Sequence, residues 1–200
     1  MTAAPTGRPA ALVLAAGAGT RFGMPKALIE IDGDTFVDRA VRILRDGGCD
    51  PIVVVLGAQA ADVRRMTRLE NAVVVDNPDW ASGMASSLRR GLAELTRLGA
   101  PAVVVALVDQ PWVGVDAVRR LAARWSQGAR AVVATYDGTP RNPVLLDASV
   151  WDEVAELAVG DIGARAWLRQ HADEVERVAC EDVGSADDVD EPDDLDPIAE

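Results

Sequence analysis

Short, solidly apolar runs recur along the chain, and each of them stops at a glycine or an aspartate. Runs of this kind, rich in valine and leucine, are typical of strands that are buried on both faces of a sheet. They cover residues 10–16, 52–56, 72–75, 102–108 and 131–136. A final strand is predicted at residues 174–179.

Apolar residues at helical spacing lie between these runs. The segment 35–45 has this spacing and ends close to Gly47 and Gly48, which predicts a helix with a glycine stop. Ser82 is the predicted N-cap of a helix at 82–98, with Gly99 just beyond its end. The other predicted helices cover residues 60–69, 115–127, 150–157 and 162–170.

The alternation of strands and helices predicts a three-layer α/β/α sandwich with a mostly parallel sheet. Ligands of such sheets bind beyond the carboxyl ends of the strands. Two segments are predicted at that edge: the glycine-rich loop after the first strand, and Asp109 after the fourth.

Composition limits the number of domains and the class of protein. We expect one domain over residues 1–200, with residues 1–9 as a flexible lead that does not resemble a signal peptide. No run of about 18 apolar residues occurs, so no membrane-spanning helix is predicted. Cys49 and Cys180 lack the spacing of metal ligands and are expected to be buried free thiols. These features together favour the cytoplasm.

The net charge of −12 is concentrated at one end of the chain. Residues 181–200 contain ten acids and no base, which leaves 22 acids and 20 bases in the remainder. By composition, this segment is a solvated acidic tail. No basic stripe is evident, so nucleic acid is not expected as a partner.

The glycine-rich loop allows two interpretations. Gly17, Gly19 and Gly23 follow a strand, as in a dinucleotide-binding fingerprint. However, Pro25 argues against a long helix directly after the loop, and the second strand ends at Gly57 rather than at an acid. The alternative is a loop that grips phosphates.

Two cations support the phosphate-binding interpretation. Backbone N–H groups of residues 16–20 would line a triphosphate, and the guanidinium of Arg21 would donate hydrogen bonds to two phosphate oxygens. Lys26, the only lysine among 20 basic residues, would reach the phosphate under attack as a compact charge. Positioning and charge neutralisation of this kind are what nucleotidyl transfer requires.

Further candidate groups follow two other strands. Asp109 ends an apolar run, where its carboxylate is placed to hold Mg²⁺, although it could instead cap the next helix. Ser82 begins a stretch of small residues whose N–H groups could contact a base or ribose, although capping and tight packing are the simpler roles.

Residues 14–26 resemble the signature of the MobA-like nucleotidyltransferases, which have a GT-A type fold. Within that group the chain most resembles the molybdenum cofactor cytidylyltransferases. The later segments that carry this resemblance, in order, are residues 77–88, 108–111, 141–146, 160–165 and 188–195.

The resemblance implies roles for individual residues. Asp109 would hold the catalytic metal, and Asp190, in the closing motif where Glu191 replaces the usual threonine, would supply a second ligand. Lys26, Arg21 and Asp109 would be the catalytic residues. The implied nucleotide contacts are Leu14, Ala15, Ala16, Gly17, Gly19, Thr20, Arg21, Lys26, Ser82 and Gly83. The implied acceptor contacts are Arg141, Asn142, Asp161 and Arg165.

These observations predict a Mg²⁺-dependent cytidylyltransferase. A terminal phosphate on a small-molecule acceptor would attack the α-phosphate of CTP, and pyrophosphate would leave. The resemblance implies molybdopterin as the acceptor and a molybdoenzyme or its chaperone as a partner. Ala16 adds a methyl group where guanine-using relatives carry a glycine, which favours CTP without excluding a guanylyltransferase.

Two other functions stay open. One is an NADP-dependent oxidoreductase that uses the glycine-rich loop, since some members of this family carry an oxidoreductase name. The other is a non-catalytic protein that delivers the cofactor to a partner enzyme, although such a carrier would not need metal and phosphate ligands.

Overall fold

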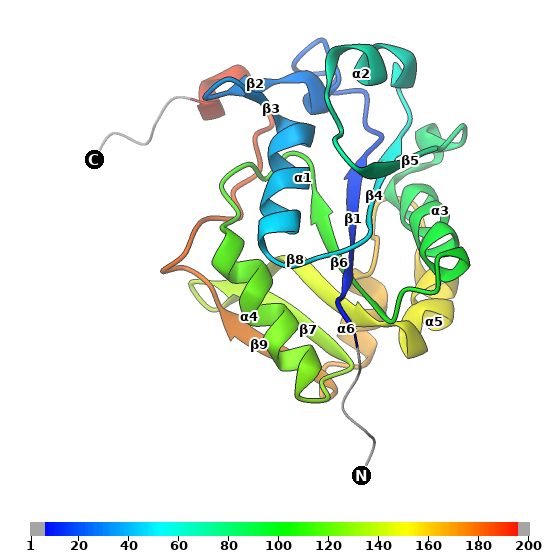
Figure 1. The fold of residues 1–200 in the computed structure, drawn as a ribbon, viewed down its shortest axis with the longest axis vertical. Coiled ribbons are helices and arrows are strands. Elements are labelled where there is room, and N and C mark those ends of the chain that lie inside the picture. The colour runs from blue at the N-terminus through cyan, green and yellow to red at the C-terminus, as the bar shows by residue number, and fades with distance from the viewer. Residues whose placement is uncertain (1–6, 196–200) are drawn as a thin grey trace.

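The apolar runs form strands of a seven-stranded sheet in the computed structural model, which describes residues 7–195 (Figure 1). Residues 1–6 and 196–200, parts of the expected lead and of the acidic segment, lie outside the described residues. The strands, in spatial order, are β5 (Ala72–Asp76), β4 (Ile52–Leu56), β1 (Ala10–Ala15), β6 (Ala102–Leu107), β8 (Thr139–Asp147), β7 (Ala131–Tyr136) and β9 (Val175–Ala179). A separate hairpin pairs β2 (Glu30–Ile31) with β3 (Asp34–Thr35).

Helices cover both faces of the sheet, as the sandwich prediction requires. The α-helices are α1 (Phe36–Asp46), α2 (Ala60–Met66), α3 (Met84–Arg97), α4 (Val115–Ser126), α5 (Trp151–Leu157) and α6 (Arg165–Gln170). The short 3₁₀ helices are η1 (Lys26–Leu28), η2 (Trp80–Ser82), η3 (Ala148–Val150) and η4 (Pro192–Leu195). Buried side chains of α1, α2 and α4 pack on one face of the sheet, and those of α3, α5 and α6 pack on the other. Within residues 7–195, no helix is long and apolar enough to cross a membrane.

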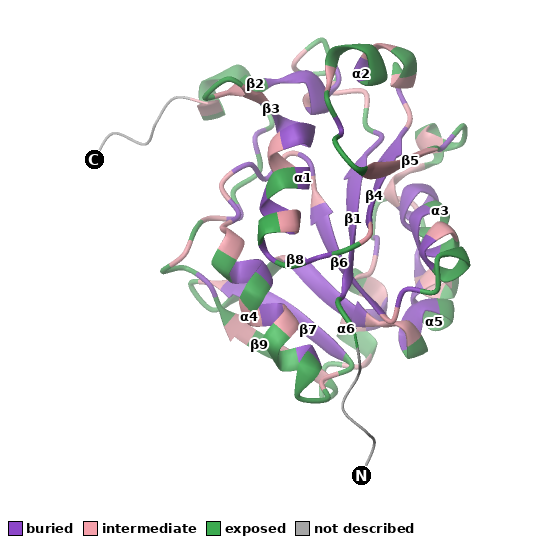
Figure 2. Cartoon of the chain, in the orientation of Figure 1, coloured by how far each residue is buried: buried purple, intermediate pink, exposed green. Residues whose placement is uncertain are grey.

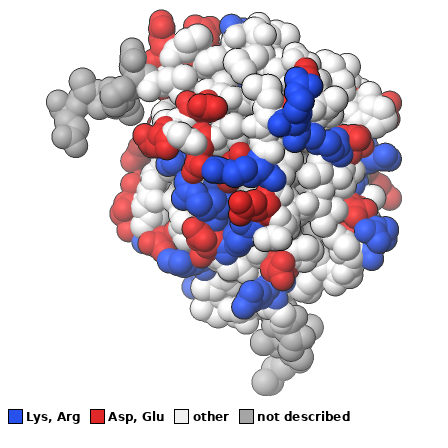
Figure 3. Space-filling view, turned by 45° about the horizontal axis from the view of Figure 1, so that its top comes forward, with Lys and Arg blue, Asp and Glu red and all other residues white. Residues whose placement is uncertain are grey.

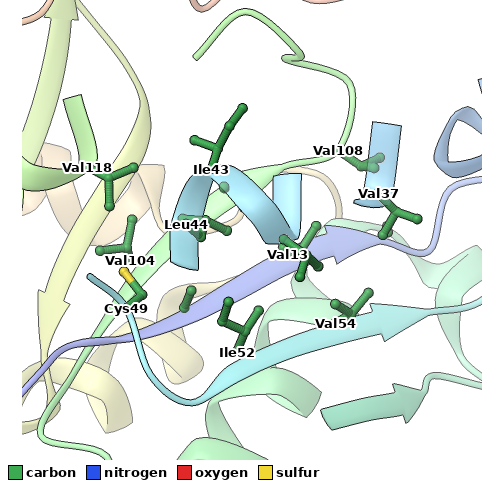
Figure 4. Close-up of a cluster of buried hydrophobic side chains, with 14 of the residues drawn as sticks. Val13, Val37, Ile43, Leu44, Cys49, Ile52, Val54, Val104, Val108 and Val118 are labelled. Carbon is green, nitrogen blue, oxygen red and sulfur yellow. The ribbon is translucent and has the colours of Figure 1, made fainter. Parts of the chain in front are cut away.

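The central strands are apolar throughout because both of their faces are covered (Figure 2). In β1, Val13 belongs to the cluster under α1 and α4, whereas its neighbours Leu12 and Leu14 belong to the cluster under α3 and α5. Cys49 lies in the first cluster close to Val104 and Leu44 (Figure 4). Cys49 and Cys180 are both buried and free, which confirms the prediction for the thiols.

One strand departs from the parallel pattern. Strand β8 is antiparallel to both β6 and β7, whereas the other neighbouring pairs of the sheet are parallel. Its register on β7 shifts between Val133, which pairs with Val144, and Ala134, which pairs with Arg141. The irregularity leaves Asn142 and Pro143 as extra residues, and bulges of this kind redirect side chains near sites.

The sheet order reverses between β1 and β6, and this is where the candidate residues meet. Successive strands run from β1 outward through β4 and β5 on one side, and the chain then returns to place β6 on the other side. The N–H group of Val108 donates to the carbonyl of Leu14 at 3.3 Å, so the ends of the two strands stay together. The glycine-rich loop and Asp109 therefore lie at a topological switch point, which is the usual ligand site of such sheets.

Candidate active site

The glycine-rich loop leaves β1 and closes on itself before η1. Gly19 has a φ of +58°, and a Cβ atom at this position would lie 2.0 Å from the carbonyl oxygen of Met24. Only glycine fits such a position, because other residues would be strained there and would collide with the backbone. At Gly17, by contrast, a Cβ atom would meet no protein atom within 4 Å. The loop leads into the three-residue η1, so no long helix begins there, as Pro25 predicted.

Lys26 contacts two carboxylates that lie far apart in the sequence. Its Nζ atom donates to Asp109 Oδ2 at 3.0 Å and to Asp190 Oδ1 at 2.6 Å. Arg21 approaches the other oxygen of Asp190 at 3.6 Å, with its own side chain largely exposed. Burial opposes the charge on Lys26, but the two carboxylates outweigh this effect and raise its pKa. The hydrogen bond and charge of Lys26 lower the pKa of Asp190.

The acidic C-terminal segment is docked on the site as far as the structure describes it. Ala186 and Val189 are buried, and the N–H group of Val189 donates to the carbonyl of Asp109 at 2.9 Å. Gln110 Nε2 donates to the carbonyl of Ala186 at 3.1 Å and to Asp188 Oδ1 at 2.8 Å. The expectation of a solvated tail is therefore wrong for residues 186–190, because two apolar side chains and several hydrogen bonds anchor them.

Asp109 and Asp190 are candidate metal ligands by position and chemistry. Their oxygens lie within 3.0 Å of the same Lys26 nitrogen, so both carboxylates face one small volume. Helix α4 begins at Val115 with Gly114 as its N-cap, so Asp109 does not cap the following helix. Among residues 7–195, no group of three or more His, Cys, Asp or Glu side chains could hold a metal alone. Two carboxylates suit Mg²⁺, which usually takes its other ligands from phosphates and water.

The start of α3 differs from the sequence prediction. Ser82 lies in η2, and the N-cap of α3 is Gly83, so the prediction that Ser82 caps the helix is wrong. The cap comes instead from a distant loop, because the N–H group of Met84 donates to Asp161 Oδ1 at 3.0 Å. The N–H group of Ala85 donates to the carbonyl of Gly160 at 2.8 Å. These two N–H groups are therefore satisfied within the protein.

A cavity of about 600 Å³ extends from the switch point towards α6 and β9. Leu14, Met84 and Gln110 line it, and these residues border the loop, the start of α3 and the metal candidates. Of the predicted acceptor contacts, Arg141, Asn142 and Arg165 line the cavity. Asp161 is not among the lining residues, and its carboxylate is engaged by α3.

Some polar residues of this cavity were given no role from the sequence. Arg169 and Arg177 line it together with Gln110, whose buried Oε1 atom accepts no hydrogen bond from the described residues. Arg169 follows Arg165 by four residues, so helical spacing could have placed it on the same face of α6. No comparable signal identifies Arg177, because its role depends on which strands neighbour β9.

Comparisons with known proteins place the chain in a family. The MobA-like NTP transferase domain family matches residues 11–175. A protein named nicotine blue oxidoreductase from Paenarthrobacter nicotinovorans is 40% identical over 187 residues, which is 90% of each chain. A probable molybdenum cofactor guanylyltransferase from Opitutus terrae is 32% identical over 130 residues, which is 64% of this chain and 61% of the relative.

A solved structure shows the same fold. Rv0371c from Mycobacterium tuberculosis superposes with a TM-score of 0.80 at 29% identity, covering 94% of this chain and 95% of the other. A second structure of Rv0371c, in complex with manganese, has a TM-score of 0.74 at 28% identity and covers 86% of this chain and 88% of the other. On the match over residues 11–175, the chain belongs to the MobA-like NTP transferase family.

Proposed function

We propose that this nucleotidyltransferase family member transfers CMP from CTP to a phosphorylated small-molecule acceptor in a Mg²⁺-dependent reaction. The observation that carries the proposal is the convergence of Lys26, Asp109 and Asp190 beside the glycine-rich loop. These three side chains supply one compact cation and two carboxylates at the place where a triphosphate would enter. The adjoining cavity, with Arg141 and Arg165 in its lining, is a site for the second substrate.

The residues present fit a divalent cation, which would neutralise charge on the triphosphate when bound. Asp109 and Asp190 would hold it, and the manganese complex of Rv0371c supports a divalent metal in this fold. Lys26 would then turn from the carboxylates to the α-phosphate, where negative charge increases in the transition state. Arg21, which is exposed at the loop, would bind the β- and γ-phosphates.

The transfer itself needs little further help from the protein. An oxygen of the acceptor phosphate forms a bond to the α-phosphorus, the bond to the bridging oxygen breaks, and pyrophosphate leaves. A phosphate dianion is already a nucleophile near neutral pH, so no general base is required. The protein would contribute to catalysis by aligning the two substrates and neutralising their charges.

The choice of base rests on Ala16 at the end of β1. This residue is buried, with 7% of its surface exposed. Under the proposal, its methyl group would take space that a glycine would leave to a purine. One methyl group discriminates by about 1–3 kcal/mol, which is enough to prefer CTP over GTP. Molybdopterin is the acceptor that fits the resemblance and the guanylyltransferase relative, and a molybdoenzyme or its chaperone would receive the product.

Thermal unfolding with added nucleotides tests the proposal directly. CTP, GTP, ATP and NADPH would each be added with and without Mg²⁺, to the wild-type protein and to the Asp109→Asn variant. A ligand at 100 times its dissociation constant stabilises the folded state by about 2.7 kcal/mol. We expect a Mg²⁺-dependent shift with CTP that Asp109→Asn abolishes. Equal shifts with and without Mg²⁺, or no shift with any triphosphate, would refute the metal-dependent transfer.

An NADPH-dependent oxidoreductase is the second candidate, because the relative with that activity in its name aligns over 90% of both chains. Its test is the loss of NADPH absorbance in the presence of a dye acceptor. Oxidation of NADPH that persists in Lys26→Met would favour this function, since hydride transfer does not need the charge of Lys26.

A further inference from the structure

The arginines around the cavity differ from the other arginines of the chain. Of the 19 arginines, 14 make a side-chain hydrogen bond or ion pair within residues 7–195. On the face drawn in Figure 3, basic side chains accordingly lie beside acidic ones. Four of the other five line the cavity, and they are Arg141, Arg165, Arg169 and Arg177. These four have no side-chain partner among the described residues.

No acid lines the cavity itself, although Asp188, which accepts a hydrogen bond from Gln110, lies close enough to Arg141 for their charges to interact. The lining contains four arginines and neither Asp nor Glu, although the whole chain carries a net charge of −12. Arg165 and Arg169 are four residues apart on α6, where two like charges destabilise a helix unless a counter-charge binds. An anionic ligand would supply that counter-charge.

The sheet separates the arginines along the cavity. Strand β8, which carries Arg141, is the immediate neighbour of β6, the strand that leads to Asp109. Strand β9, which carries Arg177, lies beyond β7, so the two arginines stand on strands that are about 10 Å apart. Arg169 lies one turn farther along α6 than Arg165. A Cβ atom at Gly163, two residues before Arg165, would lie 3.1 Å from Met84 Sδ, so the start of α6 is close to the start of α3. Arg141 and Arg165 are therefore taken as the arginines nearer the candidate transfer site, and Arg169 and Arg177 as those farther from it.

Much of the rest of the lining is apolar. Val133 lies on β7 between the two strands that carry arginines, and Val144, Leu168 and Val175 are further apolar lining residues on β8, α6 and β9. A ligand that follows the cavity would therefore meet both the arginines and apolar side chains.

We propose that the cavity selects acceptors that carry two separate anionic groups, joined by a body that packs against apolar side chains of the lining. Arg141 would bind the phosphate that is presented for transfer, and Arg169 and Arg177 would bind a second anionic group at the far end. This assignment of ends rests on the proposed function, because that function places the reacting phosphate beside Asp109. The two far arginines are then specificity-determining residues, since an acceptor with only one anionic group leaves them unpaired.

A matched pair of probes tests the inference without nucleotide or metal. Biphenyl-4-sulfonate and biphenyl-4,4′-disulfonate share one apolar body and differ by one terminal anion. Isothermal titration at low ionic strength should show that the disulfonate binds the wild-type protein about tenfold more tightly or better. High salt should reduce this difference.

Variants locate the second anion site. Arg169→Gln and Arg177→Gln should each reduce the affinity for the disulfonate towards that for the monosulfonate, and should leave the monosulfonate unchanged. Arg124→Gln is the control, because Arg124 pairs with Glu176 of the same edge strand but does not line the cavity. All three side chains are on the surface, and thermal unfolding would verify that each variant folds.

Equal binding of the two probes by the wild-type protein would overturn the inference. So would a preference for the disulfonate that survives in both Arg169→Gln and Arg177→Gln, or one that the control also loses. The proposed function fails separately: CTP transfer to a phosphorylated acceptor could be absent while the probes behave as expected. Conversely, if the protein transfers CMP but its cavity binds the two probes equally, only the proposal of a second anion site is refuted.

Discussion

Replacing Lys26 by methionine would remove the one charge that joins the two metal candidates. The side chain is only 17% exposed, and methionine keeps a similar length and an apolar stem. Asp109 Oδ2 and Asp190 Oδ1 would lose the nitrogen that lies 3.0 and 2.6 Å from them. The change therefore acts on charge at the site and leaves the packing around it nearly intact.

The expected losses in activity and in stability differ in size. A preorganised charge that faces the transition state contributes about 2.7–4 kcal/mol, so turnover should fall by about 10²–10³-fold. Stability should fall by only about 1 kcal/mol, because Asp190 is 52% exposed and solvent screens the ion pair. A selective loss of turnover is the signature of a catalytic cation.

The assay is release of pyrophosphate from CTP with Mg²⁺ and a phosphorylated acceptor, with urea unfolding in parallel. The matched control is Arg120→Met, because Arg120 pairs with Asp182 of the same C-terminal segment but lies outside the candidate site. If Lys26→Met kept ordinary turnover, or lost no more than Arg120→Met, the catalytic role of Lys26 would be refuted.

Three further predictions follow from local geometry. Gly19→Ala should weaken CTP binding at least tenfold in calorimetry, because the added Cβ atom would lie 2.0 Å from the carbonyl oxygen of Met24. Gly17→Ala should keep the wild-type melting temperature, because its added Cβ atom would meet no protein atom within 4 Å. Asp161→Ala should reduce the free energy of unfolding in urea by about 1 kcal/mol, whereas Asp161→Asn, which can still accept from the first N–H group of α3, should keep most of it. Burial raises the pKa of the Cys49 thiol from 9.0 to about 12. As the pH rises, the unfolded chain therefore loses this proton at a lower pH than the folded chain does. The urea midpoint should therefore fall faster above pH 9 for the wild-type protein than for Cys49→Ala.

The central sheet was predictable because a strand that is buried on both faces appears in the sequence as a continuous apolar run. A strand such as β1 must be apolar at every position, and its ends are then visible as glycine or aspartate. The prediction of a sandwich with ligands at the carboxyl edge follows from that pattern alone. Strand β8 was less visible, since only its second half is apolar while residues 139–142 are polar or proline and mostly exposed.

The features missed by the sequence analysis depend on contacts between distant segments. The cap of α3 comes from Asp161, 77 residues beyond the helix start, so a search for a local cap selected Ser82 instead. Of the four cavity arginines, Arg141 and Arg165 were implied by the resemblance, but only the strand order brings Arg177 of β9 into the same cavity. Residues 186–190 contain only two buried apolar side chains among several acids, which is too little to distinguish them from a solvated segment.

The distribution of charge explains how an acidic chain could bind anionic substrates. At physiological ionic strength, charges are screened over about 8 Å, so an acid of the C-terminal segment affects the glycine-rich loop only where the fold brings it close. Under the proposed function, the cations within direct reach of the ligand would decide its affinity there. These are Lys26, Arg21 and the cavity arginines that have no ion-pair partner among residues 7–195. Asp190 is an acid that the fold brings this close, since residues 186–190 hold it against Lys26. The acidic segment thus delivers one carboxylate to a position where a divalent cation between protein and triphosphate would need it.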